Sequence, residues 1–530
     1  MATVEAPIHT QIRLHEGPFV NEPLVDFTKD ENARKMRAAI EKVRGQLGRE
    51  YDLIIGGQRV RTSDKIKSIN PAKPSQVVGL HQKAGKEHVE PAMQAALEAF
   101  GGWSRLSAEE RASLVFRVGD VMRERKFEFC AWLVFEVSKN WAEADADIAE
   151  TIDFCEYYAR EALRLARTEL PVQMPGERDS LLYIPLGVGA VIPPWNFPCA
   201  IMAGMTLASI VSGNTVILKP SSDSPTIAAK FVELLEECGM PEGVVNFCPG
   251  AGATFGNAVV GHPKTRYIAF TGSREVGLDI NKSAATQAPG QIWIKRTVLE
   301  MGGKDAIIVD ADADVDSAVE GVAQAAFGFQ GQKCSACSRA IIDERIYDKF
   351  LEKLKARVEK ITVGDPAENA NMGAVINEAS MKSILDYIEV GKKDGRVITG
   401  GGPAKNAGEG YFLQPTVIAD IPAKSRLEQE EVFGPLLAVI KSKNYDHALE
   451  IANDTEFGLT GAVYTNSREK IERAIREFHV GNLYINRKCT GATVAAHPFG
   501  GFNMSGTDSK SGGPDYLYLF TQGKAVGEKI

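Results

Sequence analysis

Two cysteines stand three residues apart in the segment GFQGQKCSACSR, residues 328–339. Such a pair could supply a single thiolate nucleophile, a redox-active dithiol or half of a zinc site. A zinc site usually needs a second pair of ligands, and the chain has no other Cys-x-x-Cys and no close Cys/His pair. A thioredoxin-like dithiol follows the first strand of a small βαβ unit, whereas Cys334 and Cys337 follow a long alanine-rich stretch in mid-chain. The pattern favours one activated cysteine, with a thiol-binding or metal-binding protein as the non-enzyme alternative.

Two further segments could bind a dinucleotide. RYIAFTGS predicts a strand that ends in Thr271, Gly272 and Ser273 just before a helix. Ser273 can cap that helix while the first backbone N–H groups face a pyrophosphate, although an ordinary serine cap explains it equally well. GAGATFG contains Gly252 and Gly256, but its spacing is one residue longer than the G-x-G-x-x-G fingerprint. A simple turn is therefore the stronger interpretation of that segment.

The elements that would position these residues alternate between short apolar strands and helices. Strands are expected at GVGAVIPP, NTVILKP, GVVNFCPG, RYIAFTGS and KDAIIVD. Between them, PTIAAKFVELLEECG places Ile227, Phe231, Leu234, Leu235 and Cys238 on one face of a helix. This alternation predicts a parallel sheet in a doubly wound α/β domain, with a dinucleotide at the carboxyl ends of the strands.

Other elements surround this domain. Residues 85–168 have a helical pattern throughout, and YDLIIGGQRVRT has a hairpin signal at Gly56 and Gly57. After residue 303 a second alternating set begins, which predicts a second α/β domain. ITGGGPAKNAGEG is expected to form a surface loop.

Composition and charge narrow the function classes. The chain has 530 residues, 44% of them hydrophobic, and a formal net charge of −8. It has no dense Lys/Arg tract, which disfavours a nucleic-acid partner, and no window approaches the roughly 20 apolar residues of a membrane span. The eight cysteines are scattered through apolar segments, and the first residues lack the features of a secretory signal. We therefore expect a cytoplasmic protein.

Seven motifs occur in the order found in the aldehyde dehydrogenase superfamily, which the chain resembles over about residues 50 to 525. The motifs are PPWNFP (193–198), ILKPSSDSP (217–225), FTGS (270–273), LEMGGKDA (299–306), GQKC (331–334), EEVFGP (430–435) and PFGGFNMSG (498–506). The resemblance implies an α/β fold with a Rossmann-type cofactor domain, a second α/β catalytic domain and a small oligomerisation arm. The implied segments are an N-terminal arm (1–50), a cofactor-binding domain (51–302) interrupted by part of the oligomerisation arm at about 165–185, a catalytic domain (303–505) and a C-terminal oligomerisation tail (506–530).

The resemblance also implies a reaction. Cys334 would be the nucleophile that adds to an aldehyde, and Cys337 would be a bystander. The side-chain amide of Asn196 and the backbone N–H of Cys334 would stabilise the oxyanion. The thiohemiacetal would pass a hydride to the nicotinamide, and Glu300 would then activate the water that hydrolyses the thioester. No metal is expected in this reaction.

The expected cofactor is NAD. By resemblance, Lys219 would bind the adenosine ribose, Glu431 the nicotinamide ribose, and Phe433 would pack near the nicotinamide ring. Many NAD-preferring relatives carry a glutamate three residues after the lysine, where this chain has Ser222. Because that departure removes a charge that would repel a 2′-phosphate, use of NADP stays open. The other expected cofactor contacts are Pro194, Trp195, Gly252, Gly256, Thr271, Gly272 and Ser273.

Within the superfamily, NWAEADADIAETIDFCEYYAR and FGGFNMSGTDSKSGGPDYLYLF are similar to segments of the 1-pyrroline-5-carboxylate dehydrogenases. Those enzymes oxidise L-glutamate γ-semialdehyde to L-glutamate in the second step of proline catabolism. For that substrate, Ser335, Gly491 and Ala492 would hold the carboxylate. Glu150 would lie near the ammonium group, although a solvated helix face explains this residue equally well. The residues expected along the aliphatic stem are Phe197 and Phe499.

Partners and alternatives follow from the same resemblance. The segment at about 165–185 and the tail would form a pairing sheet, and exposed apolar residues in LYLF (517–520) indicate an interface. A homodimer or higher homo-oligomer is therefore expected. The chain has no flavin domain, so proline would be oxidised on another polypeptide, and a transient contact with that proline dehydrogenase is an open question. The competing enzyme hypothesis is a dehydrogenase of another small semialdehyde, with either water or coenzyme A as the acyl acceptor.

Overall fold

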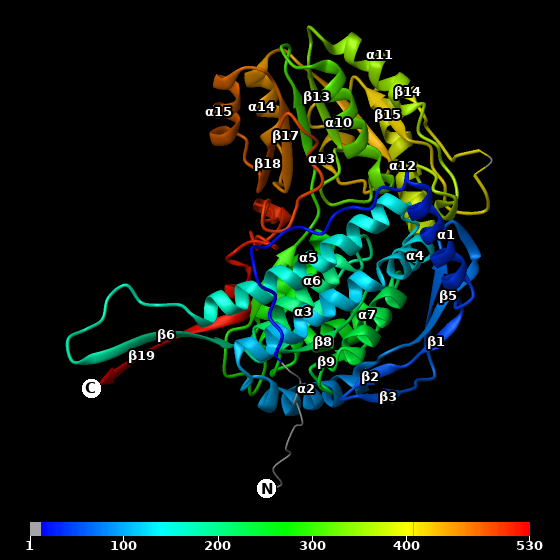
Figure 1. The fold of residues 1–530 in the computed structure, drawn as a ribbon. Coiled ribbons are helices and arrows are strands. Elements are labelled where there is room, and N and C mark those ends of the chain that lie inside the picture. Colours follow the sequence, from blue (N-terminus) through cyan, green and yellow to red (C-terminus); the bar gives the residue numbers. More distant parts are fainter. Residues whose placement is uncertain (1–11, 406) are drawn as a thin grey trace.

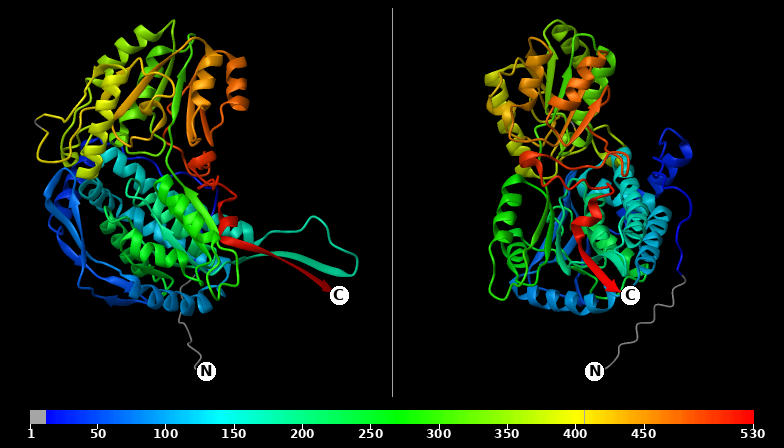
Figure 2. Two further views of the ribbon diagram at one scale, coloured as in Figure 1. Left: turned by 180° about the vertical axis from the view of Figure 1, so that it is seen from behind. Right: turned by 90° about the vertical axis from the view of Figure 1, so that its left-hand side faces the viewer.

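Two bodies of sheet and helix lie one above the other, and a two-stranded ribbon projects from the lower one (Figure 1). This computed structural model describes residues 12–405 and 407–530. Residues 1–11 of the expected N-terminal arm lie outside the described residues. The C-terminal segment runs along the junction of the two bodies before it enters the ribbon (Figure 2).

The lower body contains a seven-stranded sheet in the order β11-β10-β7-β8-β9-β2-β3. Its five strands from β11 to β9 are parallel, and β7 and β8 are buried along their whole length. Four of the five strands predicted for this domain are therefore confirmed, whereas KDAIIVD forms β12 (Ala306–Val309) in the sheet of the upper body. The strands are β11 (Arg296–Glu300), β10 (Tyr267–Thr271), β7 (Val188–Ile192), β8 (Thr215–Leu218), β9 (Val245–Phe247), β2 (Leu53–Ile55) and β3 (Gln58–Val60).

The sheet is not parallel throughout, because β2 runs antiparallel to both β9 and β3. β2 and β3 form the predicted hairpin, whose turn is Gly56–Gly57. Both glycines have positive φ angles, 58° and 77°, as a tight two-residue turn of a right-twisted hairpin requires.

Helices pack on this sheet, and four of them lie within residues 85–168, where the sequence predicts a helical pattern. α3 starts at a capping box, in which Ser107 accepts from the Glu110 backbone N–H at 3.2 Å and Glu110 accepts from the Ser107 N–H at 2.7 Å. α7 carries four of the five predicted core residues, Cys238 follows it directly, and all five are buried. The helices are α2 (Val89–Trp103), α3 (Ala108–Glu124), α4 (Lys126–Val137), α5 (Trp141–Ala166), α6 (Ala200–Val211), α7 (Pro225–Glu237), α8 (Asn257–Gly261) and α9 (Arg274–Ala285), with short turns η1 (Lys86–His88) and η2 (Gly252–Gly256).

The upper body contains a second seven-stranded sheet in the order β14-β15-β16-β13-β12-β17-β18, which confirms the second α/β unit. Only the β14–β15 pair at its edge is antiparallel. The strands are β14 (Arg396–Thr399), β15 (Thr416–Ala419), β16 (Leu436–Ser442), β13 (Arg339–Asp343), β12 (Ala306–Val309), β17 (Thr460–Tyr464) and β18 (Asn482–Ile485). The helices are α10 (Val315–Phe327), α11 (Tyr347–Val358), α12 (Glu378–Asp394), α13 (Arg426–Gln429), α14 (Tyr445–Asn453) and α15 (Arg468–Glu477), with short turns η3 (Gly328–Gly331), η4 (Pro366–Glu368) and η5 (Asn503–Ser505).

The described part of the N-terminal arm packs closely on the lower body. α1 (Asp30–Arg44) buries Met36, Ile40 and Val43 in the same core that contains α4 and α5. A three-stranded sheet that the sequence analysis did not anticipate lies nearby, with β1 (Arg49–Tyr51), β5 (Lys73–Gln82) and β4 (Lys65–Asn70) in that order. Two of its strands are half exposed and polar, so their apolar alternation is weak.

The ribbon consists of β6 (Glu177–Pro185) paired antiparallel with β19 (Thr521–Lys529) over nine residues each. The expected exposure of LYLF is wrong, because Leu517 and Phe520 are fully buried in the main core on η6 (Tyr516–Phe520). Phe520 packs edge-on against Tyr267 of β10 at 5.4 Å between ring centroids. The tail therefore divides at Phe520 into a packed part and a ribbon strand.

The parallel strands of the lower sheet end along one edge. Val191 on β7 pairs with Leu218 on β8, Ile192 with Phe270 on β10, and Thr271 with Glu300 on β11. The residues that follow these strand ends must therefore gather at the same edge, the usual position of ligands in open α/β sheets.

Candidate active site

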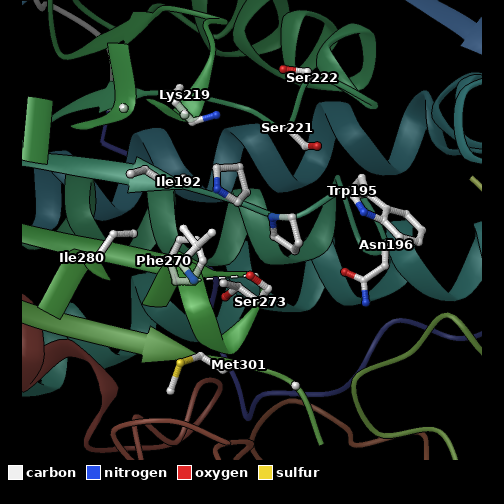
Figure 3. Close-up of a pocket in the computed structure, with 18 of the residues that line it drawn as sticks. Ile192, Trp195, Asn196, Lys219, Ser221, Ser222, Phe270, Ser273, Ile280 and Met301 are labelled. Carbon is white, nitrogen blue, oxygen red and sulfur yellow. Dashed lines mark hydrogen bonds between the residues drawn. The ribbon is translucent and has the colours of Figure 1, made fainter. Parts of the chain in front are cut away.

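A cavity of about 670 Å³ lies at this edge of the lower sheet and reaches the upper body. Most of the residues nominated from the sequence line it, including Cys334, Asn196 and all eleven cofactor contacts. The close-up shows Trp195 and Asn196 in the segment after Ile192, with Lys219, Ser221 and Ser222 on the opposite rim from Met301 (Figure 3). The residues nominated for the cofactor that line the cavity are Pro194, Trp195, Lys219, Ser222, Gly252, Gly256, Thr271, Gly272, Ser273, Glu431 and Phe433.

Cys334 lies on the loop between η3 and β13 and is partly exposed to the cavity. The chain reaches it through a left-handed turn in which Phe329, Gln330 and Gly331 have φ of 49°, 56° and 68°. A Cβ at Gly331 would lie 2.2 Å from the carbonyl oxygen of Gly434, so this turn requires glycine. Strained backbone at a loop that carries a thiol is typical of a functional site.

The surroundings of Cys334 disfavour the thiolate form of its side chain. Burial, followed by the carboxyl groups of Asp305, Glu300 and Glu431, raises the pKa of the thiol well above its ordinary value. A nearby positive charge or a proton acceptor is therefore needed before this thiol can act as a nucleophile.

Asn196 provides the amide expected at an oxyanion hole. Its side chain is only 4% exposed, and Nδ2 donates to the backbone oxygen of Gln332 at 3.2 Å. Gln332 is itself fixed, because its Oε1 accepts from the backbone N–H of Ile376 at 2.9 Å. An amide nitrogen has two N–H groups, so the second N–H of Asn196 is free to donate to an oxygen bound in the cavity.

Glu300 is the last residue of β11 and is not among the residues that line the cavity. Its Oε1 accepts from the hydroxyl of Ser509, and within the described residues its buried Oε2 has no hydrogen-bond partner. Burial raises the pKa of this carboxyl group to about 8. An isolated, partly satisfied carboxyl group whose pKa lies near neutrality is suited to move a proton.

Lys219 follows β8 and is 8% exposed. Its Nζ donates to the backbone oxygens of Pro220 at 3.0 Å and Gly250 at 3.4 Å. An ammonium group has three donors, so one remains for a hydroxyl in the cavity. Burial without a carboxylate partner lowers the pKa of Lys219 to about 8.

Glu431 approaches the cavity from the upper body. Its Oε1 accepts from the backbone N–H of Gly303 at 3.0 Å, and Oε2 carries no hydrogen bond to any described residue. Burial raises the pKa of Glu431 to about 7. Beside it, Phe433 makes an edge contact with Trp195 at 5.5 Å between ring centroids. A carboxylate and two aromatic faces at one end of the cavity suit a ribose attached to a flat ring.

The helix α9 begins at the other side of the cavity. Ser273 caps it by accepting from the backbone N–H of Val276 at 3.4 Å. A Cβ at Gly272 would lie 2.5 Å from the ring of Phe270, and a Cβ at Gly252 would point into open space. Glycines here keep the backbone accessible next to a helix N-terminus, which suits a pyrophosphate group. The simple-turn interpretation of GAGATFG is incomplete, because that segment forms η2 on the cavity wall.

None of the residues nominated for substrate binding lines this cavity; Glu150 lies on α5 and the others lie on loops. The backbone oxygen of Ser335 accepts from the Cys489 thiol at 3.3 Å, which joins the cysteine loop to the segment of Gly491 and Ala492. Gly491 is exposed with φ of 78°, and Ala492 is half-buried. Phe499 exchanges two backbone hydrogen bonds with Ser511, at 2.8 and 2.7 Å.

Phe197 and Glu150 belong to a charged cluster beside these loops. The Nζ of Lys139, which is completely buried, lies 3.8 Å from the ring centroid of Phe197 and 2.8 Å from Oδ2 of Asp147. Burial, followed by the charge of Asp147, raises the pKa of Glu150 to about 8. The Glu150 side chain is half-buried, so its role as a partner of the ammonium group stays a prediction beside the solvated-face interpretation.

Comparison with known proteins assigns the chain to a family. The sequence model described as the aldehyde dehydrogenase family matches residues 59–526. The chain belongs to the aldehyde dehydrogenase family. A 1-pyrroline-5-carboxylate dehydrogenase of Geobacillus thermodenitrificans is 56% identical over 513 residues, which cover 96% of this chain and 99% of the relative.

Solved structures extend the comparison. A crystal structure of 1-pyrroline-5-carboxylate dehydrogenase from Thermus with bound NAD has a TM-score of 0.95 and 51% identity, and the match covers 98% of this chain and 100% of that one. Proline utilization A from Bdellovibrio bacteriovorus has a TM-score of 0.95 and 44% identity, and the match covers 98% of this chain but 54% of that chain. The α/β aldehyde dehydrogenase fold expected from the sequence is confirmed.

The site of this aldehyde dehydrogenase also contains three residues that the sequence patterns do not single out. Ser509 holds Glu300, and Gln332 orients Asn196. Asp305, whose Oδ1 accepts from the Thr460 backbone N–H at 2.7 Å, contributes to the field at Cys334. The signal that could have found Ser509 is the polar run GTDSKSGG directly after a nominated motif. Gln332 and Asp305 lie within nominated motifs, but their roles depend on contacts that the sequence does not reveal.

The aldehyde dehydrogenase keeps Cys334 and Cys337 in different surroundings. Cys337 is buried in the core of the upper body, where its thiol donates to the backbone oxygen of Arg339 at 3.4 Å. Neither cysteine joins a group of metal-ligand side chains within residues 12–405 and 407–530. The one such group found there is His15, Asp120 and Glu156, whose two carboxylates already pair with Arg123.

None of the helices in the described ranges of this aldehyde dehydrogenase is both long enough and apolar enough to cross a bilayer.

Proposed function

We propose that this aldehyde dehydrogenase is a 1-pyrroline-5-carboxylate dehydrogenase that oxidises L-glutamate γ-semialdehyde to L-glutamate with NAD. The observation that carries the proposal is the 56% identity to the Geobacillus enzyme over 96% of this chain and 99% of that one. The cavity fits NAD, because it combines an exposed backbone at a helix N-terminus with a buried lysine and a half-buried carboxylate that both retain hydrogen-bonding capacity.

NAD, when bound, supplies the hydride acceptor and a positive charge on its nicotinamide ring. Pro194, Trp195 and Phe433 would enclose that ring, and Glu431 would accept hydrogen bonds from the adjoining ribose. At the other end of the cavity, Lys219 would donate to the second ribose, and the backbone N–H groups after Ser273 would face the pyrophosphate. Gly252 and Gly256 would leave room for the phosphates along η2. Thr271 and Gly272 would leave room for the phosphates to approach the start of α9.

Cys334 starts the chemistry. Its thiol loses its proton to solvent, and its sulfur then adds to the aldehyde carbon to form a thiohemiacetal. The second N–H of Asn196 and the backbone N–H of Cys334 stabilise the negative charge on the carbonyl oxygen. Loss of a hydride from the thiohemiacetal carbon leaves a thioester on Cys334.

Glu300 completes the cycle. Its carboxylate takes a proton from water, the resulting hydroxide attacks the thioester carbon, and the Cys334 thiolate leaves as L-glutamate forms. Ser509 fixes Oε1 of Glu300, so Oε2 is the oxygen that accepts the proton. A base of this kind favours water over coenzyme A as acyl acceptor.

The substrate side would recognise an amino acid. Ser335 and the backbone N–H groups at Gly491 and Ala492 would bind its carboxylate, with Phe197 and Phe499 along the carbon chain. Glu150 would face the ammonium group, and the positive charge of that group would lower the raised pKa of Glu150 and keep its carboxyl group ionised.

The same proposal includes the roles of the chain segments, the assembly of subunits and the location of the enzyme. The segments 1–50, 51–302, 303–505 and 506–530 would act as N-terminal arm, cofactor domain, catalytic domain and tail. The ribbon, which carries Leu182 at 48% exposure, would pair subunits into a homodimer or higher oligomer. The eight free cysteines fit a cytoplasmic location, where a separate proline dehydrogenase would supply the substrate.

The test is a comparison of substrates. Purified protein is mixed with 1-pyrroline-5-carboxylate and NAD, and the absorbance of reduced NAD is followed. We expect the kcat/KM for this substrate to exceed that for propanal by at least about 100-fold, because only the semialdehyde carries groups that the charged site can bind. Faster oxidation of propanal, or a coenzyme A thioester as the product, would contradict the proposal.

A further inference from the structure

Residues 12–28, which we call the N-terminal strap, cross the surface of the lower body in an extended conformation. Figure 1 shows this blue segment running over α3 and α5 before it reaches α1. Two aromatic contacts hold it on α5: Phe19 against Tyr157 at 5.3 Å and Phe27 against Trp141 at 5.6 Å between ring centroids. The aldehyde dehydrogenase family match begins at residue 59, after the strap. The general fold therefore does not explain why the strap is there.

Asn21 is the residue at which the strap touches two other segments at once. Its Nδ2 donates to Oδ2 of Asp153 at 2.8 Å and to the backbone oxygen of Val494 at 3.1 Å. The other oxygen of Asp153, Oδ1, accepts from the backbone N–H of Glu22 at 2.6 Å. One amide nitrogen thus ties the strap and the Val494 segment to the same carboxylate on α5.

Val494 belongs to the segment that carries the proposed carboxylate-binding amides. It is 4% exposed and comes three residues after Gly491 and two after Ala492. A second tie holds the same segment to α5: the Ala495 N–H donates to the Gly512 oxygen at 2.8 Å, and the Gly512 N–H donates to the Tyr158 hydroxyl at 2.9 Å. The segment is therefore fixed to α5 through Tyr158 on one side and through Asn21 on the other.

The two ends of the proposed substrate site meet on this helix. Glu150, the proposed partner of the ammonium group, lies one turn before Asp153 on α5. Gly491, on the carboxylate side, is exposed, and within the described residues its oxygen is bonded only by Arg487, at 2.9 Å. Few local contacts hold this glycine, so its position depends on the anchor at Val494.

We propose that Asn21 is a positioning residue for the amino acid end of the substrate, because it holds the Gly491–Ala492 segment at a set distance from Glu150 on α5. The inference deepens the proposed function and depends on it. Backbone N–H groups bind a carboxylate only when both point at it, so a loosened segment weakens binding without touching Cys334. An aldehyde that lacks the carboxylate and ammonium groups makes no use of this arrangement.

The experiment compares the intact enzyme with Asn21→Ala on two aldehydes, L-glutamate γ-semialdehyde and propanal, with NAD saturating. We expect the KM for the semialdehyde to rise about tenfold with kcat little changed, the effect of losing one buried hydrogen-bonding anchor. The kcat/KM for propanal is expected to stay at its wild-type value. Asn21→Asp, which keeps the shape but places a second carboxylate beside Asp153, is expected to raise the same KM further.

Arg123→Gln is the matched control. Arg123 holds the next strap residue, because its Nε donates to Oε2 of Glu22 at 2.8 Å, but it does not contact Val494. It should therefore leave the ratio of the two kcat/KM values unchanged. Thermal unfolding of all three variants shows whether the strap is merely destabilised.

The results distinguish failure of the positioning role of Asn21 from failure of the proposed function. Equal losses on both aldehydes in Asn21→Ala, or an unchanged semialdehyde KM in both Asn21 variants, would overturn the positioning role while the proposed function stands. A wild-type enzyme that oxidises propanal but not the semialdehyde would overturn the proposed function itself, whatever the variants do.

Discussion

The two sides of Cys334 are built differently. On the cofactor side, which we define as the cavity-lining residues around Lys219, Ser273 and Glu431, the side chains mostly follow the ends of parallel strands in one sheet. On the substrate side, defined by Ser335, Gly491 and the other residues nominated for the substrate, they come from a helix and from loops of both bodies. Hydrogen bonds between distant segments, such as the one from Cys489 to Ser335, hold that side together.

This difference separates features that can serve any aldehyde from features that serve one substrate. A sheet edge fixes the cofactor groups through backbone geometry, so the same side can serve any aldehyde. The substrate side depends on a buried charge cluster and on loop anchors, which a different substrate would not need. Changes on one side should therefore leave the other largely intact, and three experiments test that independence.

The largest effect is expected at Cys334, where the cofactor side and the substrate side meet. Cys334→Ala removes the nucleophile, so turnover should fall by roughly 10⁶-fold, the loss typical of deleting a covalent nucleophile. NAD binding, measured by calorimetry, should change little, because the cofactor side makes no bond to the sulfur. Cys337→Ala is the control: its thiol is buried in the upper body, and most activity should remain. Similar losses in the two variants would show that Cys334 has no special role.

Glu300→Gln should have the next largest effect. Hydrolysis of the thioester should slow by about 10²- to 10⁴-fold, so one equivalent of reduced NAD should appear in a burst before slow turnover. Because burial raises the pKa of Glu300 to about 8, the carboxyl group is mostly protonated below that pH and cannot act as a base. The wild-type kcat should therefore rise with pH up to about 8, and the variant should lack this limb. Turnover without a burst would exclude Glu300 from the hydrolysis step.

Ser222→Glu should have the smallest effect and should be confined to the cofactor side. Ser222 is exposed at the cavity rim, and a carboxylate about 4 Å from a 2′-phosphate costs about 1 kcal/mol in water, roughly a fivefold loss of affinity. The KM for NADP should rise by that factor while the KM for NAD and for the aldehyde stay unchanged. A rise in the aldehyde KM would mean that the two sides are coupled.

The cofactor side could be predicted from the sequence better than the substrate side. The strands of the lower sheet and the residues at their ends were predictable, because apolar runs bounded by turn residues recur there and motif order places them at one edge. LYLF was misjudged, because an apolar run near a chain end looks the same whether it is exposed or packed against Tyr267. The strap contacts of Asn21 were not predictable, because they join residues that lie far apart in the sequence and meet only in the fold.

One consequence of the ribbon concerns biosynthesis. Its two strands lie more than 300 residues apart along the chain, so β6 leaves the ribosome long before its partner exists. A nascent chain therefore carries β6 as an open edge until its last nine ribbon residues have emerged. A chain that stops before β19 would keep that edge unpaired and would be prone to aggregate.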